Sequence, residues 1–325
     1  MKSTVFVAAI ASASANEWDN FKNTYGKVFN GPDHEEEHRQ VYLSNMRYVA
    51  SINAQNLPYK LGENQFSDLT QQQYRVAAGL GWMPAPEEGS MALLSTHVHS
   101  GEELADSVDW RTMGAVTPIK DQGQCGSCWS FGTTGGIEGQ WQIATGQLKS
   151  LSEQQLVDCA GFPNMGCSGG NPQFAVGYES KHAVASESSY PYQAKKGSCQ
   201  TSFQTAIPSG GVTGYNKVGG LFGANKNDMM SAVQQQPVSI AIQADQQSFQ
   251  SYQSGVLTAN CGTQLDHAVL AVGYGTENGQ DYWLVKNSWG TSWGDAGYIK
   301  IGSDTNQCGV LNQAGYPSVT GSVAV

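Results

Sequence analysis

The sequence predicts an α+β fold in which a mainly helical part, about residues 109–208, precedes a mainly β part, residues 209–325. Two observations carry this prediction. Ser152 followed by Gln155 forms a capping box ahead of apolar residues, which is typical of a helix N-terminus. Beyond Pro208 the apolar residues come in short runs, as expected of strands, at 238–242, 268–272, 282–285 and 298–301.

The composition excludes several classes of protein. Hydrophobic residues make up 39% and charged residues 14% of the 325-residue chain, which is typical of globular proteins. No apolar run approaches the roughly 18 residues that would span a bilayer. The net charge is −10 and lysines and arginines form no cluster, which argues against contacts with phosphates. We therefore expect neither a membrane nor a nucleic acid as a partner.

Residues 1–15 are typical of a short secretory signal peptide. Lys2 precedes an apolar stretch from Val5 to Ala11, and small residues follow before the sequence turns polar. The alternative is an ordinary N-terminal strand or tail. A signal peptide would send the chain into the secretory pathway, where disulfides can form.

Residues 17–80 carry a helical pattern. Six residues at steps of three and four lie on one helix face: Glu35, Arg39, Tyr42, Asn45, Val49 and Asn53. Because this face mixes charged, amide and apolar groups, periodicity alone indicates only an amphipathic helix that packs on something.

Two further segments precede the helical part. The alternating segment from Gly62 through Asn64 and Phe66 to Asp68 predicts a short strand. Residues 85–101 are rich in proline, glycine, serine and glutamate, which indicates an exposed connection where a cleavage site would fit.

The seven cysteines are informative because their number is odd. Three disulfides would leave one thiol. The Cys-x-x-Cys pair Cys125 and Cys128 allows three interpretations: half of a zinc site, a redox dithiol, or a bridge next to a nucleophile. Zinc is disfavoured because no second close pair exists, so we expect no metal. A thioredoxin-like dithiol would need a βαβ unit.

Four segments favour the third interpretation, a bridge next to a nucleophile, because together they resemble a known family. They are Gln122 to Phe131 around the cysteine pair, Gly166-Cys-Ser-Gly-Gly170, Leu265-Asp-His267-Ala-Val269, and Lys286-Asn287-Ser-Trp289-Gly290. With them, the chain from Trp18 onward resembles cathepsin L-like members of the papain family of cysteine peptidases. The six-residue helical face is similar to the family's ERFNIN propeptide motif, and the segment from Gly62 to Asp68 is similar to its GxNxFxD motif.

The resemblance implies a domain organisation. After the signal peptide, residues 16–103 would form a helical inhibitory propeptide, and residues 104–325 the mature peptidase. The mature part would have the papain-like two-domain fold, with a helical left domain, a β-barrel-like right domain and the active-site cleft between them.

The resemblance also implies the catalytic roles. Cys128 would be the nucleophile, at the N-terminus of a helix whose dipole favours the thiolate. His267 would act as base and acid, and Asn287 would orient its ring under the cover of Trp289. Gln122 would supply the side-chain donor of the oxyanion hole. The implied disulfides are Cys125–Cys167, Cys159–Cys199 and Cys261–Cys308, with Cys128 as the odd thiol.

For the substrate, the resemblance implies an extended peptide paired with Gly169 and Gly170. The pocket for the side chain two residues before the cut would be lined by Asn171, Pro172, Ala241, Leu265, Ala268 and Gln313. Many relatives have a large apolar residue in place of Asn171, so a preference for bulky apolar side chains does not follow here. The double-histidine insertion of cathepsin B-like members is missing, which favours an endopeptidase.

The expected partners are protein and peptide substrates, the chain's own propeptide and cystatin-like inhibitors, with a monomer as the default and no cofactor. The destination would be a lysosome-like or vacuolar compartment, or the outside of the cell. Acid would loosen the propeptide by protonating carboxylates such as Asp68 and those of residues 35–37. Two alternatives stay open: an inactive relative that serves in binding or storage, and a dithiol oxidoreductase.

Overall fold

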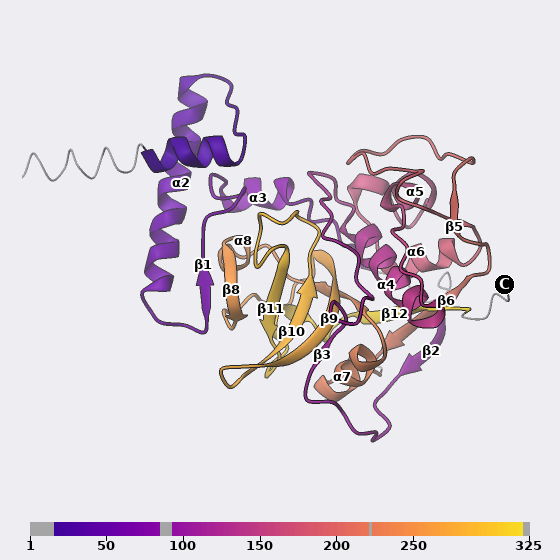
Figure 1. Ribbon diagram of the computed structural model, residues 1–325. Coiled ribbons are helices and arrows are strands. Elements are labelled where there is room, and N and C mark those ends of the chain that lie inside the picture. Colours follow the sequence, from indigo (N-terminus) through magenta and orange to yellow (C-terminus); the bar gives the residue numbers. More distant parts are fainter. Residues whose placement is uncertain (1–15, 85–92, 221–222, 321–325) are drawn as a thin grey trace, which may run out of the picture.

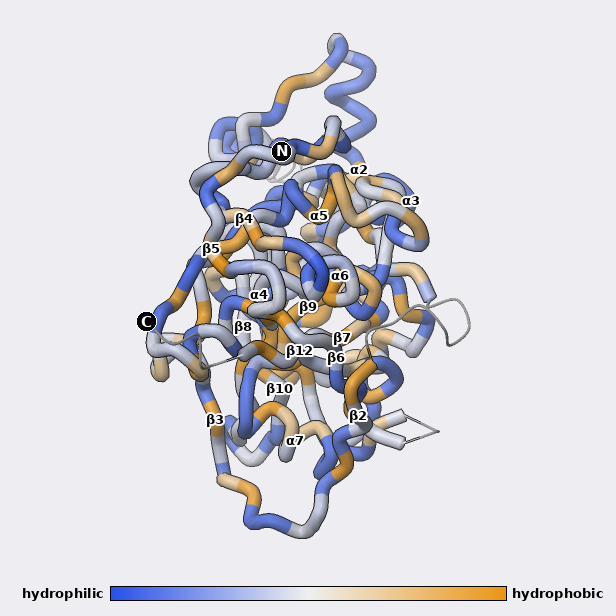
Figure 2. The backbone as a smooth tube through the Cα atoms, turned by 90° about the vertical axis from the view of Figure 1, so that its right-hand side faces the viewer, coloured by the Kyte–Doolittle hydropathy of each residue, from blue (hydrophilic) through white to orange (hydrophobic). Residues whose placement is uncertain are grey.

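The computed structural model describes residues 16–84, 93–220 and 223–320, so the expected signal peptide lies outside the described residues. The α+β prediction is confirmed (Figure 1): helices of the middle of the chain pack beside a sheet built mainly from its last third. In Figure 2 the central strands carry hydrophobic stretches, whereas the N-terminal helices at the top are mainly hydrophilic. No helix in the described ranges is long and apolar enough to cross a bilayer.

The N-terminal segment begins with a helical stretch over residues 16–24 and continues with α2 (Pro32–Asn53), β1 (Tyr59–Leu61) and α3 (Gln71–Ala77). The predicted helix face is confirmed, since Tyr42, Asn45 and Val49 are buried. Tyr42 joins an aromatic cluster with Trp18 and Phe21.

The predicted strand at residues 62–68 is wrong. The strand ends at Leu61, and the segment that follows is a turn in which Asn64 Oδ1 accepts a hydrogen bond from Phe66 N and Ser67 N donates to Asn64 O. The alternation arises because the turn buries Asn64, Phe66 and Asp68. Asp68 is held by Lys27 Nζ at 2.7 Å and His38 Nδ1 at 3.0 Å. A side-chain-capped turn therefore imitates the period of a strand.

The helical part contains α4 (Cys128–Thr145), α5 (Glu153–Cys159), the 3₁₀ turn η1 (Gly166–Ser168) and α6 (Pro172–Glu179). At α5, Ser152 Oγ accepts from Gln155 N, but the predicted capping box is incomplete, because Ser152 N donates to Ala185 O and the Gln155 side chain binds Ala183 O and Ala185 N. Helix α4 is rich in glycine because it lies directly on the sheet: a Cβ on Gly135 would be 2.9 Å from Leu270 Cδ2, and one on Gly139 2.6 Å from Pro237 Cγ. Close packing on the sheet replaces the helix propensity that glycine lacks.

The main sheet has ten strands in the order β1-β8-β11-β10-β9-β7-β12-β6-β2, with β3 paired to β9. Its members not yet given are β2 (Leu93–His97), β3 (Val108–Asp109), β6 (Val212–Val218), β7 (Val238–Ile242), β8 (Tyr252–Leu257), β9 (His267–Glu277), β10 (Gln280–Lys286), β11 (Tyr298–Gly302) and β12 (Ala314–Val319). All four predicted strand runs fall within these strands. The remaining elements are β4 (Val184–Ala185) with β5 (Thr205–Ile207), α7 (Lys226–Gln235), α8 (Gln247–Gln250) and η2 (Gln307–Gly309).

Two expectations about this sheet need correction. Among the described strands the path is open, so the right domain is not a closed barrel. Both ends of the path, β1 and β2, belong to the segment before residue 104. Strand β2 also lies inside the stretch predicted as an exposed connection. Its side chains are mostly exposed, so no alternation in the sequence marks it, and its backbone pairing with β6 makes it a strand.

Candidate active site

The N-terminus of α4 meets the start of β9, which brings two predicted catalytic residues to one place. Cys128 is the first residue of α4 and His267 the first of β9, and both are fully buried. The backbone of Ala268, next to His267, lies close enough to the Cys128 thiol to act on its pKa. Helix and strand thus position the two side chains from different layers of the fold.

The imidazole of His267 is fixed on one side. Its Nε2 lies 2.8 Å from Asn287 Oδ1, and the ring of Trp289 stacks on it with centroids 4.7 Å apart. Since an amide oxygen only accepts, Nε2 carries the hydrogen. The buried Nδ1 then has its lone pair available and no hydrogen-bond partner among the described residues. Such a ring is ready to accept a proton at Nδ1.

Gln122 is oriented by the residue that follows Asn287. Its Oε1 accepts from Ser288 Oγ at 2.6 Å, and its Nε2 donates to Cys125 O at 2.9 Å and Gly79 O at 2.8 Å. Both hydrogens of the side-chain amide are thus engaged, and Cys125, which accepts one of them, lies three residues before Cys128. The other is taken by a carbonyl of the N-terminal segment.

Burial sets the protonation states of this site. It raises the pKa of the Cys128 thiol to about 11, although backbone groups of Ala268 and Gly81 act in the other direction. It also lowers the pKa of His267 to about 4, against the hydrogen bond with Asn287. Near neutral pH the covered site therefore holds a neutral thiol and a neutral imidazole rather than an ion pair.

The active site is covered by the segment from Gly79 to Met83, which belongs to the N-terminal part of the chain. Gly170 N donates to Gly81 O and Met83 N donates to Gly170 O, both at 2.9 Å, and Trp82 pairs with Gly170 in a parallel bridge. A Cβ on Gly170 would lie 2.8 Å from the ring of Trp129, and one on Gly81 2.3 Å from Gly126 O. Glycines on both sides therefore allow the two backbones to pair. The N-terminal segment occupies the strip predicted for substrate.

Of the six predicted pocket residues, only Asn171 lines the neighbouring cavity, and Gln313 contacts Asn171 through its side chain. Asn171 Nδ2 donates to Met83 O at 2.9 Å, its Oδ1 accepts from Gln313 Nε2 at 3.2 Å, and it also caps α6 through Gln173 N. Pro172 follows Asn171 as the first residue of α6. Ala241 on β7 is paired with Ala268 on β9, and Ala241 N donates to Gln313 O. Leu265 packs against Gly309, on the segment that leads to Gln313. Beside Asn171 lies a mainly apolar cavity of about 250 Å³, lined also by Met83, Phe162, Met165 and Phe174.

Comparison with known proteins agrees with this geometry. Residues 104–318 match the family model "Papain family cysteine protease", and residues 18–74 match "Cathepsin propeptide inhibitor domain (I29)". The chain belongs to the papain family of cysteine proteases. It is 45% identical to "Digestive cysteine proteinase 1" of Homarus americanus over 97% of this chain and 98% of that one. It is 43% identical to "Probable cysteine protease RD21B" of Arabidopsis thaliana, over 89% of this chain and 62% of that one.

Solved structures of papain-family proteases include precursors of the same arrangement. The digestive procathepsin L 3 of Tenebrio molitor larval midgut is 36% identical, with a TM-score of 0.84 over 94% of this chain and 99% of that one. The protease is thus a cysteine endopeptidase precursor of the cathepsin L-like type, with an inhibitory domain before the peptidase domain. That domain indicates intramolecular inhibition and protein substrates.

The disulfides of the protease pair as the resemblance implied: Cys125–Cys167, Cys159–Cys199 and Cys261–Cys308. All seven cysteines lie in the described ranges, and Cys128 is the unpaired one. A dithiol at Cys125 and Cys128 is contradicted, because Cys125 is already bridged. Three disulfides are consistent with passage through the secretory pathway.

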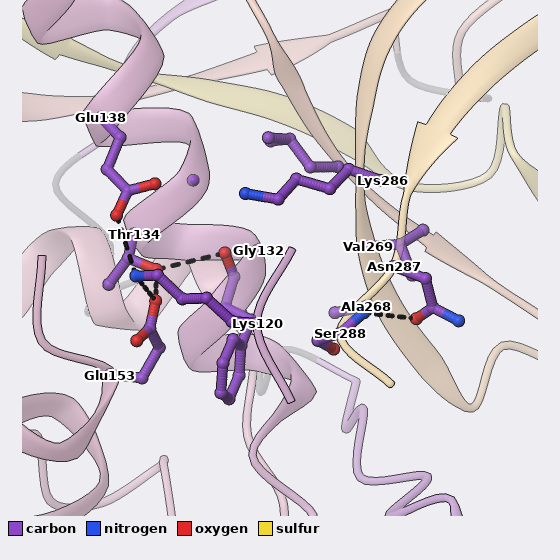
Figure 3. A pocket seen from close by; sticks show the side chains of 13 residues that line it. Lys120, Gly132, Thr134, Glu138, Glu153, Ala268, Val269, Lys286, Asn287 and Ser288 are labelled. Atoms are coloured by element: carbon purple, nitrogen blue, oxygen red, sulfur yellow. Dashed lines mark hydrogen bonds and ion pairs between the residues drawn. The ribbon is translucent and has the colours of Figure 1, made fainter. Parts of the chain in front are cut away.

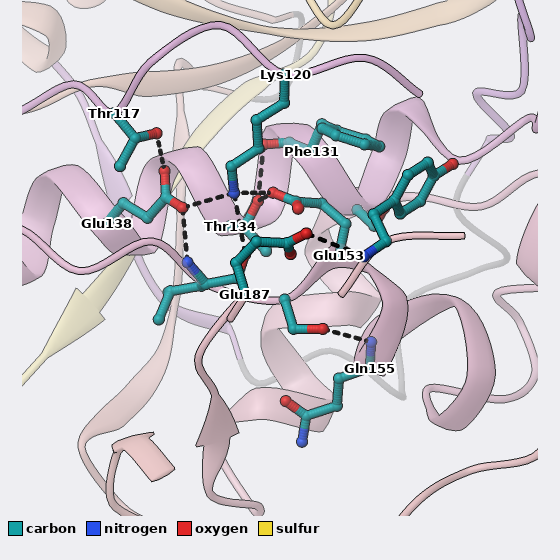
Figure 4. Close-up of polar contacts among 12 residues, drawn as sticks. Thr117, Lys120, Phe131, Thr134, Glu138, Glu153, Gln155 and Glu187 are labelled. Carbon is teal, nitrogen blue, oxygen red and sulfur yellow. Dashed lines mark hydrogen bonds and ion pairs between the residues drawn. The ribbon is translucent and has the colours of Figure 1, made fainter. Parts of the chain in front are cut away.

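A buried charge cluster beside the active site was missed by sequence reasoning. Lys120 Nζ binds Glu138 Oε1 at 3.0 Å and Glu153 Oε1 at 2.6 Å, while Lys286 Nζ donates to Thr117 Oγ1, which donates to Glu138 Oε2 (Figures 3 and 4). Lys286 directly precedes Asn287, and a small pocket of about 20 Å³ lies between α4 and β9. The feature of the sequence that could have indicated this cluster is Glu138, because it is the single charged residue of α4.

Burial and charge pairing oppose each other in this cluster. Burial raises the pKa of Glu153, whereas Lys120 and Lys286 overcome burial at Glu138 and hold its pKa low. Burial lowers the pKa of Lys286. Glu187, which accepts from Tyr192 N, has its pKa raised to about 7 by burial and by Glu153. The two buried lysines are therefore balanced by carboxylates on α4 and α5.

Proposed function

We propose that Cys128, His267, Asn287 and Gln122 hydrolyse peptide bonds through a thioester. The observation that carries this proposal is the imidazole of His267, clamped at Nε2 by Asn287 and vacant at Nδ1, at the strand end that faces Cys128. Once the cleft is opened to water, the burial that keeps both groups neutral is relieved, and proton transfer from the thiol to Nδ1 gives the thiolate–imidazolium pair.

The reaction then runs in two balanced halves. The thiolate attacks the carbonyl carbon, and the oxyanion accepts hydrogen bonds from Gln122 Nε2 and from Cys128 N. The C–N bond breaks, the imidazolium gives its proton to the leaving amine, and a thioester remains on Cys128. His267 takes a proton from water as the water attacks the thioester. The C–S bond breaks, the carboxylic acid product leaves, and the imidazolium returns its proton to the sulfur of Cys128, which restores the thiol and the neutral imidazole.

The same proposal includes how the precursor is sorted and activated. The signal-like residues 1–15 direct it into the secretory pathway, and removal of residues 16–103 frees the peptidase as a monomer in a lysosome-like or vacuolar compartment or outside the cell. Cystatin-like inhibitors fit the emptied cleft. Acid favours release by weakening the fold of the propeptide, since hydrogen bonds from Lys22 and Trp18 lower the pKa of Glu35. A carboxylate whose pKa is lowered by a contact loses that contact as pH falls.

Alkylation tests the proposal directly. The processed, unreduced protein is treated with iodoacetamide at pH 7, and its mass and peptidase activity are followed together. We expect one modified cysteine, at position 128, and loss of activity in step with it. The precursor, whose thiol is buried and has a raised pKa, should react at least ~100-fold more slowly, since each pKa unit removes about tenfold of the thiolate.

The rival function gives a different outcome. An inactive binding protein would be alkylated at Cys128 without any activity to lose. Activity that survives full modification of Cys128 would refute the mechanism.

The pocket at Asn171 should accept polar side chains two residues before the cut, because Asn171 and Gln313 present amides there. We expect Gln313→Leu to raise the ratio of kcat/KM for leucine over threonine at this substrate position by about tenfold, in the range of one or two buried methylenes. Paired peptide substrates measure the ratio. Asn312→Leu, at the exposed neighbouring position, is the control. An unchanged ratio in Gln313→Leu would place the substrate side chain elsewhere.

A further inference from the structure

The two donors proposed for the oxyanion hole lie at the two ends of one loop. Gln122 begins this loop, and Cys128, whose backbone N–H is the second donor, ends it at the start of α4. The middle of the loop is fixed to the helical part, because Cys125 is bridged to Cys167 and Gly126 N donates to Cys167 O at 3.0 Å. These contacts do not join the two ends of the loop to each other.

The hydroxyl of Tyr192 does join the two ends. Tyr192 Oη donates to Gln122 O at 2.9 Å and lies 2.5 Å from Oγ of Ser127, the residue before Cys128. Because a phenol has a single hydrogen, which here goes to Gln122 O, the Ser127 hydroxyl must be the donor to Tyr192. Ser127 is fully buried, so water does not compete for its hydrogen. Both hydrogen bonds thus meet at the same oxygen atom.

The ring of Tyr192 is held by the helix that carries the nucleophile. It lies edge-on to Phe131 of α4, with centroids 5.0 Å apart, and it packs on the buried cluster that contains Trp129. Its backbone is fixed as well, since Tyr192 N donates to Glu187 Oε1 at 2.9 Å. Burial raises the pKa of Tyr192, so its hydroxyl keeps its hydrogen at and below neutral pH. The loop therefore binds to a hydroxyl whose position is set from outside the loop.

We propose that Tyr192 is a positioning residue for the oxyanion hole. Its hydroxyl ties the backbone of Gln122 to the side chain of Ser127, and it thereby holds the two donors, Gln122 Nε2 and Cys128 N, at the spacing that one oxyanion requires. Donors that are already in place stabilise the oxyanion without reorganisation during the reaction. Tyr192 acts through Gln122 and Cys128 and not on the substrate itself. This inference rests on the proposed peptidase function.

Tyr192→Phe keeps the ring and removes both hydrogen bonds. Ser127 Oγ is then left with its longer contact to Cys125 O, at 3.5 Å. We expect kcat of the processed protease on a peptide substrate to fall about tenfold, less than for a removed donor, because the donors are displaced and not lost. KM should stay within about twofold, since the ground-state carbonyl needs these donors less than the oxyanion does. Steady-state kinetics measures both constants.

Alkylation separates this role from damage to the nucleophile. Iodoacetamide reacts with the Cys128 thiolate by displacement of iodide and forms no oxyanion. Its rate with the processed Tyr192→Phe protease should therefore stay within about twofold of the parent.

A double variant tests whether Tyr192 acts through Gln122. In Gln122→Ala one of the two donors is already missing, so the hydroxyl of Tyr192 has less left to position. In that background we expect Tyr192→Phe to lower kcat by less than about threefold, because residues that act through one another are not additive.

Tyr190→Phe is the matched control. Tyr190 is buried in the same part of the fold, and its hydroxyl contacts Asp158 Oδ2 at 2.8 Å and Gln200 N at 3.0 Å instead of the loop. Its kcat should stay within about twofold of the parent. If Tyr192→Phe does not fold, Ser127→Ala, which removes one of the two bonds, must lower kcat at least about threefold while the rate of alkylation is unchanged.

Three results would overturn the inference. They are a loss of kcat below about twofold in Tyr192→Phe, an equal fall in the rate of alkylation, and an undiminished loss in the Gln122→Ala background. Activity that falls in Gln122→Ala but not in Tyr192→Phe would refute this inference alone. A processed parent without peptidase activity would refute the proposed function and this inference with it.

Discussion

Replacing Gln122 by alanine should lower kcat/KM of the processed protease about 100- to 1,000-fold, because it removes one donor to the oxyanion, worth ~2.7–4 kcal/mol. The amide of Gln122 is held by Ser288 Oγ at 2.6 Å, so it needs little reorganisation when the oxyanion forms. We expect KM to change little, since the carbonyl of the bound substrate needs this donor less than the oxyanion does. Steady-state kinetics on a peptide substrate measures both constants.

Gln124→Ala is the matched control, because Gln124 lies two residues away and is exposed. It should retain nearly full activity. If Gln122→Ala lost less than tenfold, or lost activity only through KM, the role of this amide in the transition state would be wrong. Iodoacetamide should still modify Cys128 in Gln122→Ala, which separates a lost donor from a disrupted site.

The second large effect concerns the buried charge cluster. Glu138→Gln keeps the shape of the side chain but leaves Lys120 and Lys286 with one carboxylate fewer, and an uncompensated buried charge costs about 3–5 kcal/mol. We expect the free energy of unfolding to fall by that amount. Urea denaturation of the precursor, carrying Cys128→Ser to prevent self-digestion, measures it.

A double variant shows whether charge is the cause. Glu138→Gln with Lys286→Met restores the balance of charge, so it should recover part of the loss. Asp106→Asn, at an exposed carboxylate, should change the stability by less than about 0.5 kcal/mol. A double variant less stable than the sum of its single variants would contradict this account of the cluster.

Much of the fold could be predicted from the residues because periodicity reports burial. The face of α2 and the apolar runs of β7, β9, β10 and β11 were found in this way. Errors arose where another cause produced the pattern. The turn at residues 62–68 alternates because its capped side chains are buried, and β2 shows no alternation because nearly all its side chains are exposed.

The sequence by itself determined the family, the odd cysteine and the residues that carry the chemistry, because these depend on residue types in a fixed order. Tertiary structure decided what the order cannot express. It brought Cys128 at a helix start to His267 at a strand start, laid Gly81 on Gly170, and closed the cluster around Lys120. It also brought the Tyr192 hydroxyl to Gln122 and Ser127, which lie 70 and 65 residues earlier in the chain and meet it only in the folded protein.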